Sequence, residues 1–95
     1  MPKTHKKEVE LINEQGLHTR PAKMFVEKSS KFESEIEIIF NDYVANGKSI
    51  MGLLGLLAYK GCRLIIRATG IDSQQAVDEL SELIETGFDE QVPKK

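Results

Sequence analysis

A histidine and an arginine stand close together in the segment 16–22, which reads Gly-Leu-His-Thr-Arg-Pro-Ala. His18 offers a nucleophilic imidazole nitrogen, and Arg20 offers a planar guanidinium that can pair two phosphate oxygens. Pro21 lacks a backbone N–H, which suits the first turn of a helix. We therefore predict a helix that begins near Thr19 with His18 at or next to its N-cap, where unpaired N–H groups favour an anion. An imidazole in this position, with the guanidinium and the N–H groups beside it, could accept and hold a phosphoryl group.

Spacing alone does not distinguish this site from an ordinary surface histidine at a helix start. Ser49 precedes an apolar segment and is expected to cap a short helix. Gly52 and Gly55 should keep that helix short or irregular. The leucines of this segment exceed what one face of a short helix can bury, so we expect a partner-docking patch. We assign to this patch Ile50, Met51, Leu53 and Leu54.

Composition limits the possible classes of protein. The 95 residues, 40% of them hydrophobic, predict a single domain over 1–95 with polar tails at about 1–7 and 88–95. A net charge of −2 argues against nucleic-acid binding. Cys62 is the only cysteine and is interpreted as a half-buried strand residue of a protein in a reducing compartment. His5, in the first tail, is expected to be solvated. We predict a cytoplasmic protein with no membrane insertion, metal or cofactor.

Hydrophobic periodicity predicts the elements that must hold His18. The expected order is βαββαβα, an α+β open-faced β-sandwich whose amphipathic helices cover the apolar side of the sheet. The third helix is expected to start at Asp72 or Ser73 and to end at Gly87. The predicted strands are a first one starting at Glu8, then 34–40, 43–45 and 62–69; the predicted helices are 19–30, a short one after Ser49, and the third.

Two separate segments resemble one family. The segment 16–22 is similar to the phosphorylatable histidine segment of HPr, the histidine-containing phosphocarrier of the bacterial phosphoenolpyruvate-dependent sugar phosphotransferase system. Residues 48–52, Lys-Ser-Ile-Met-Gly, resemble the family's regulatory serine segment. The likeness extends from about Val9 through the third helix. It implies a four-stranded antiparallel sheet with three helices on one face.

The resemblance also implies roles for particular residues. His18 would accept a phosphoryl group from phosphorylated enzyme I and pass it to A-type enzyme II components for sugar uptake. The protein would thus be a covalent phosphohistidine intermediate rather than an enzyme, and we expect a monomer. Thr19, Arg20 and Pro21 would stabilise the phosphate. Ser49 would be a regulatory phosphorylation site for an HPr kinase/phosphorylase.

Two other interpretations remain open at this point. Chains of βαββαβ order include RNA-recognition folds, but the central strands here lack the aromatic pairs that stack bases. A carrier of a regulatory phosphotransferase branch that moves no sugar would keep both His18 and Arg20. The sequence does not separate that carrier from a sugar carrier. Asn46 and Gly47 before Lys48 depart from commoner forms of the serine segment.

Overall fold

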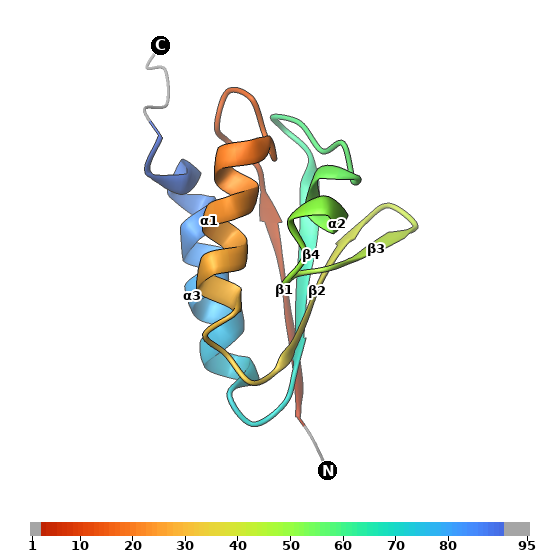
Figure 1. Cartoon of the computed structure of the whole chain (residues 1–95), viewed down its shortest axis with the longest axis vertical. Helices are drawn as coiled ribbons and strands as arrows, with labels where there is room; N and C mark the ends of the chain where they lie inside the picture. Colours follow the sequence, from red (N-terminus) through yellow and green to blue (C-terminus); the bar gives the residue numbers. More distant parts are fainter. Residues whose placement is uncertain (1–2, 91–95) are drawn as a thin grey trace.

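The computed structural model describes residues 3–90 and has one sheet with helices on one of its faces (Figure 1). The predicted order βαββαβα is confirmed, and a short 3-10 helix, η1, follows the last α-helix. The elements are β1 (Thr4–Glu10), α1 (Thr19–Ser29), β2 (Glu35–Phe40), β3 (Tyr43–Asn46), α2 (Ile50–Leu54), β4 (Arg63–Thr69), α3 (Ser73–Glu85) and η1 (Gly87–Asp89).

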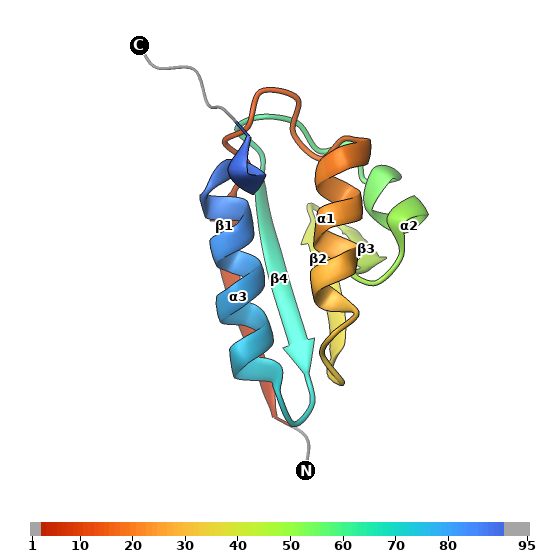
Figure 2. The same ribbon diagram turned by 60° about the vertical axis from the view of Figure 1, so that its left-hand side comes forward.

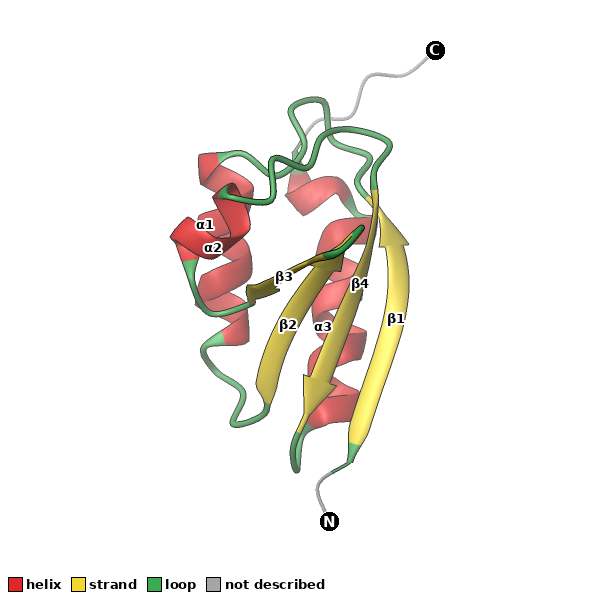
Figure 3. Cartoon of the chain, turned by 90° about the vertical axis from the view of Figure 1, so that its right-hand side faces the viewer, coloured by secondary structure: helices red, strands yellow, loops and turns green. Residues whose placement is uncertain are grey.

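All strand pairs are antiparallel, in the spatial order β1-β4-β2-β3 (Figure 3). The hairpin between β2 and β3 turns at Asn41, whose φ of 55° lies in the left-handed region that asparagine tolerates. Central strand β4 pairs with β1 on one side and with β2 on the other, and Ile66 lies opposite both Lys7 and Ile38. This arrangement fixes which face of each strand meets the helices.

The core lies between the sheet and the helices, which cover one face (Figure 2). Alternate residues of the strands point into it because successive side chains leave a strand on opposite sides. The remaining face of the sheet carries exposed or half-buried side chains such as Arg63, Arg67 and Glu35. The open-faced sandwich is therefore confirmed. Fully buried core side chains include Phe25, Ile38, Leu64, Ile66, Leu80 and Ile84.

The first strand begins earlier than predicted, so the proposed tail over 1–7 is wrong for residues 4–7. Thr4 pairs with Thr69 and the register continues to Glu10. Lysines conceal the alternation here, since Lys6 and Lys7 occupy an edge strand, where charged side chains are common. His5 is not simply solvated, because its Nδ1 lies 2.9 Å from the hydroxyl of Ser73.

The second proposed tail is also wrong over its first residues. Gly87 ends α3 as predicted, with a φ of 70°. Phe88 then enters the core and is fully buried. This aromatic side chain fixes the chain just before Glu90, whose side chain is only 17% exposed. The rest of the proposed tail, 91–95, lies outside the described residues.

Helix α2 is short, as its glycines predicted, and spans 5 residues. Leu53 is fully buried, so its assignment to the docking patch is wrong: it faces the core and is not available to a partner. Leu57 lies beyond the helix end, with a φ of 55° and an exposed fraction of 80%. Of these two leucines, Leu57 is therefore the one that is exposed and Leu53 belongs to the core.

Candidate functional site

His18 is the N-cap residue of α1, as predicted. Its backbone is extended (φ −89°, ψ −169°), and its side chain makes no capping hydrogen bond. The His18 carbonyl accepts the first helical bond from the N–H of Ala22 at 2.9 Å. Pro21 has no N–H, and within residues 3–90 the N–H groups of Thr19 and Arg20 make no backbone hydrogen bond. At the positive end of the helix, these donors therefore have no backbone partner among the described residues.

The loop before His18 is held against the segment that follows α2. The N–H of Leu17 donates to the carbonyl of Ala58 at 3.1 Å. Gly16 has a φ of +62°, and a Cβ placed there would lie 2.6 Å from the Cα of Tyr59. Only glycine permits this close approach, since any other side chain would collide with the backbone. The side-chain amide of Asn13 donates to the Gly16 carbonyl at 2.7 Å and closes the turn.

Packing along α1 fixes the direction of the helix start. Pro21, Ala22 and Phe25 are buried on the inner side of the helix, while Arg20 and Lys23 are exposed. Burial of an aromatic side chain such as Phe25 contributes about 1.5–3 kcal/mol. The helix is therefore held by its core contacts, and His18 is not needed to stabilise the helix through its side chain.

A carboxylate completes the cluster around His18. The Nε2 atom of His18 lies 3.2 Å from Oε2 of Glu90, and Nη1 of Arg20 donates to the same oxygen at 2.9 Å. The amide of Asn13 donates to the other oxygen, Oε1, at 3.1 Å. Burial alone raises the pKa of Glu90, but hydrogen bonds from Asn13, Arg20 and His18 outweigh it and lower that pKa below its usual value.

Sequence reasoning missed both Asn13 and Glu90. Each lies in a segment that was interpreted only as a loop or a polar tail. The available signal was Phe88, because a large aromatic side chain in a polar stretch marks a point where that stretch packs against the core. A chain fixed at Phe88 near the end of α3 brings Glu90 to the start of α1.

Ser49 is the N-cap of α2, as predicted, and its hydroxyl accepts a hydrogen bond from the N–H of Gly52 at 2.9 Å. The neighbouring Lys48 donates its Nζ to the carbonyl of Phe32 at 2.7 Å. Helices α1 and α2 are in contact and lie side by side in Figure 2. His18 and Ser49 thus stand at the starts of two adjacent helices.

The exposed apolar residues near Ser49 differ in part from those predicted. Met51 is 78% exposed and Ile50 is 37% exposed. Leu54 is partly buried against the core. Leu57 and Tyr59, beyond the helix, are largely exposed. We call the group Ile50, Met51, Leu54 and Leu57 the α2 patch.

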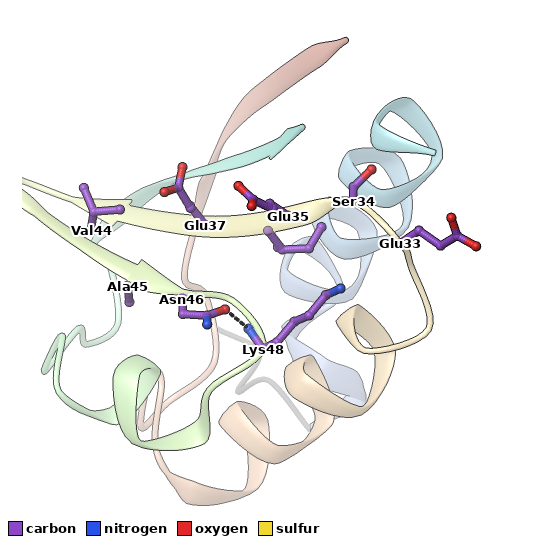
Figure 4. Close-up of a pocket in the computed structure, with 9 residues that line it drawn as sticks. Glu33, Ser34, Glu35, Glu37, Val44, Ala45, Asn46 and Lys48 are labelled. Atoms are coloured by element: carbon purple, nitrogen blue, oxygen red, sulfur yellow. Dashed lines mark hydrogen bonds between the residues drawn. The ribbon is translucent and has the colours of Figure 1, made fainter. Parts of the chain in front are cut away.

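A shallow hollow of about 410 Å³ lies elsewhere, between β2, β3 and Lys48 (Figure 4). Its lining includes Glu33, Glu35 and Glu37 and does not include His18. Glu37 pairs with Arg67 at 2.6 Å, and the amine of Lys48 is bound to the backbone. This hollow is therefore separate from the candidate site.

Residues 3–90 contain no group of three or more His, Cys, Asp and Glu side chains that could hold a metal ion. No helix within this part of the chain is long and apolar enough to cross a membrane.

An imidazole at an open helix start, beside a guanidinium, on a four-stranded open-faced sandwich, indicates a protein that carries a phosphoryl group on a histidine. The family model described as the PTS HPr component phosphorylation site matches residues 5–86. The phosphocarrier protein HPr of Neisseria meningitidis serogroup A is 41% identical over 85 residues, which cover 90% of this chain and 96% of the relative. The chain belongs to the HPr family.

Solved structures agree with this family. A crystal structure of HPr from Thermoanaerobacter tengcongensis has a TM-score of 0.89 and 38% identity, covering 93% of this chain and 99% of that one. A crystal structure of an HPr dimer from the same organism has a TM-score of 0.73 and 40% identity, covering 86% and 94% of the two chains. The protein is therefore a phosphocarrier of the phosphotransferase system, and not an enzyme with a turnover of its own.

Proposed function

We propose that His18 accepts the phosphoryl group from phosphorylated enzyme I and passes it to A-type enzyme II components for sugar uptake. The observation that carries this proposal is the position of the imidazole at the N-terminus of α1, where no capping hydrogen bond occupies the ring. The side chain is 33% exposed, so a partner can reach it. We place this transfer in the cytoplasm.

The phosphate of phospho-His18 would be held by groups of the first turn. Thr19 and Arg20 supply backbone N–H groups that make no backbone hydrogen bond to the part of the chain that the structure describes, and the helix dipole favours negative charge there. The Arg20 side chain is 57% exposed, and its guanidinium supplies further donors in bidentate geometry. Pro21 contributes no donor, and its fixed φ instead sets the start of the helix.

Ser49 is proposed as a regulatory phosphorylation site for an HPr kinase/phosphorylase. Ser49 is half-buried and directly precedes Ile50 of the α2 patch, which we propose as the docking surface for enzyme I and enzyme II components. A phosphate at Ser49 adds about −1.5 to −2 charges beside that surface. We propose that the protein acts as a monomer and as one domain.

The test is incubation with phosphoenolpyruvate and enzyme I, followed by intact-mass measurement. We expect one acid-labile, alkali-stable phosphoryl group on the wild type and none on His18→Ala, because the acceptor nitrogen is lost. His5→Ala is the matched control, since His5 lies on β1 against Ser73, and it should be labelled like the wild type. Labelling of His18→Ala would overturn the assignment.

A carrier of a regulatory phosphotransferase branch would give the same labelling. The two are distinguished by the acceptor: phospho-His18 should discharge onto an A-type enzyme II component of a sugar branch. Discharge onto a regulatory-branch component alone would favour the second function.

A further inference from the structure

The loop that leads to Ser49, residues 46–48, is held by the last residue of α1. Ser29 is fully buried, and its hydroxyl donates to the carbonyl of Gly47 at 2.6 Å. The same hydroxyl lies 3.2 Å from the carbonyl of Val26, so Gly47 is the closer acceptor for its one proton. Gly47 is itself buried, and its carbonyl would lose this partner without the hydroxyl.

Backbone hydrogen bonds hold the same loop against β2 and fold it toward α2. The N–H of Gly47 donates to the carbonyl of Ile36 at 2.7 Å. The N–H of Lys48 donates to Oδ1 of Asn46 at 2.9 Å (Figure 4), and the N–H of Ser49 donates to the Asn46 carbonyl at 3.0 Å. A Cβ at position 47 would lie 2.5 Å from Cγ2 of Ile36, so the loop can lie this close to β2 because residue 47 is glycine.

The hydroxyl of Ser49 is oriented by the helix start that follows this loop. Its oxygen accepts a hydrogen bond from the N–H of Gly52 at 2.9 Å, and the hydroxyl proton takes no part in that bond. In phosphorylation, this proton passes to a base of the kinase while the oxygen attacks the terminal phosphorus of ATP. The bond from that phosphorus to the bridging oxygen breaks, and ADP leaves with the electron pair.

We propose that Ser29 is a positioning residue for the phosphorylation of Ser49. Through the Gly47 carbonyl, its buried hydroxyl holds the loop 46–48, so that the Ser49 hydroxyl is presented from a helix start that is already formed. This inference rests on the proposed role of Ser49 as a phosphorylation site. Helix α2 has only 5 residues, and so short a helix depends on the contacts that anchor its ends.

The burial of Ser29 separates this role from the docking of a partner. The hydroxyl lies inside the protein, whereas Met51 and Leu57 of the α2 patch are largely exposed. A kinase should therefore bind Ser29→Ala nearly as well as the wild type. A misplacement of about 1 Å in an attacking atom can cost about 100-fold in rate, so a loosened loop should slow the chemical step instead.

The first test measures amide hydrogen exchange in the free protein by NMR. Ser29→Ala should speed the exchange of the Gly47 and Gly52 amides by about tenfold more than that of the β4 amides, because local opening of the loop becomes easier. Ile84→Val is the control for a general loss of stability, since it removes a core methyl group beneath α3. It should not affect the two glycine amides selectively. An equal change at the glycines and in β4 of Ser29→Ala overturns the proposed anchoring.

The second test measures steady-state phosphorylation of Ser49 by an HPr kinase/phosphorylase with ATP. Ser29→Ala should lower kcat by about tenfold and change KM by less than about twofold, since the geometry of the attack is altered and the docking surface is kept. Ser29→Cys should recover part of kcat, because a thiol is a weak donor. Ser30→Ala, at the exposed neighbouring position, and Ile84→Val should both match the wild type.

The outcomes separate this inference from the proposed function. A wild-type kcat in Ser29→Ala, or an equal fall in kcat in Ile84→Val, overturns the positioning role and leaves Ser49 as a phosphorylation site. A rise in KM alone would assign Ser29 to docking and also overturns it. A wild type that takes up no phosphate on Ser49 overturns the regulatory site together with the role of Ser29 in it. In every case Ser29→Ala should accept a phosphoryl group on His18 at the wild-type rate, because Ser29 lies at the other end of α1.

Discussion

The starts of α1 and α2 use their N-cap residues in opposite ways. The hydroxyl of Ser49 accepts a hydrogen bond from its own helix at 2.9 Å, while the imidazole of His18 makes no capping bond. Helix α2 has 5 residues and needs its cap, since so short a helix is unstable alone. Helix α1 has 11 residues and a buried face, so its N-cap side chain is free for chemistry.

This difference separates a residue whose modification leaves the hydrogen bonds of its helix unchanged from one whose side chain takes part in such a bond. A phosphate on His18 would meet the guanidinium of Arg20 and the N–H groups of Thr19 and Arg20, which make no backbone hydrogen bond within residues 3–90. A phosphate on Ser49 must keep or replace the bond to Gly52. We therefore expect changes at the start of α1 to alter phosphoryl transfer and changes at the start of α2 to alter stability and docking.

The largest effect in this comparison should come from Arg20. Arg20→Ala should slow phosphoryl acceptance by about 100-fold, the usual result of removing one donor that stabilises transition-state charge. Arg20→Lys should lie between Ala and the wild type, because it keeps the charge and loses the bidentate geometry. The measurement is the rate of phosphoryl transfer from enzyme I to each of these variants.

Lys23→Ala is the matched control, since Lys23 is an exposed cation of the same helix. It should transfer at nearly the wild-type rate. Equal rates for the Arg20 variants and the wild type would mean that the backbone donors of α1 suffice.

A smaller effect is expected from a charge at Ser49. Ser49→Asp should raise the KM of enzyme I for this protein by about tenfold, equivalent to about 1.4 kcal/mol, with little change in kcat. The negative charge would lie next to the α2 patch, where it would weaken the docking of enzyme I. Steady-state kinetics with enzyme I separate the two constants.

Ser49→Asn is the control for this effect, because asparagine caps a helix about as well as aspartate without the charge. It should behave like the wild type. If Ser49→Asn and Ser49→Asp raise KM equally, the charge is not responsible.

Removal of the α2 cap should affect stability more than transfer. Ser49→Ala should lower the free energy of unfolding by about 1 kcal/mol and the Tm by about 4–8 °C. Transfer should remain near the wild-type level, since His18 lies on another helix. Thermal unfolding by circular dichroism, with Ser30→Ala at the exposed end of α1 as control, measures this loss.

Most of the fold followed from hydrophobic periodicity, because alternation in 35–40 and 63–69 and the helical spacing of α3 reflect one buried face each. His18, Ser49 and the helix starts were also predictable, since Pro21 and the N-cap preference act locally. Glu90 was not predictable in this way. Its position beside His18 depends on Phe88 packing into the core, a contact distant in sequence that no local pattern encodes.

The errors near Lys6 and Leu53 have similar physical causes. An edge strand tolerates lysines, so β1 lost the alternation that would have extended it to Thr4. Leu53 and Leu57 are indistinguishable by type and spacing. The structure separates them because α2 ends at Leu54, which turns Leu57 away from the core.

Asp72, at the start of α3, is a third N-cap residue. A substitution there should have the smallest effect on phosphoryl transfer. Asp72 does not cap its own helix; its carboxylate accepts bonds from Ser34 and from the backbone N–H of Glu33 at 2.9 Å. The Ser34 hydroxyl and the Glu33 N–H hold the pKa of Asp72 below its usual value of about 3.9. Ionised Asp72 therefore stabilises the folded protein fully at pH values above this usual pKa. That stabilisation is lost as the pH falls through the lower pKa of the folded state.

Asp72→Asn should consequently lose less stability than the wild type on acidification below about pH 4, because it lacks this carboxylate. Chemical unfolding at pH values from neutral to acid measures the difference, and Glu90 contributes equally to both proteins. Asp78→Asn, on the same helix, should keep the wild-type profile. All three proteins should still transfer phosphoryl groups at wild-type rates, because His18 is held by α1. Parallel stability profiles for the wild type and Asp72→Asn would show that the link from α3 to Glu33 and Ser34 does not depend on the charge of Asp72.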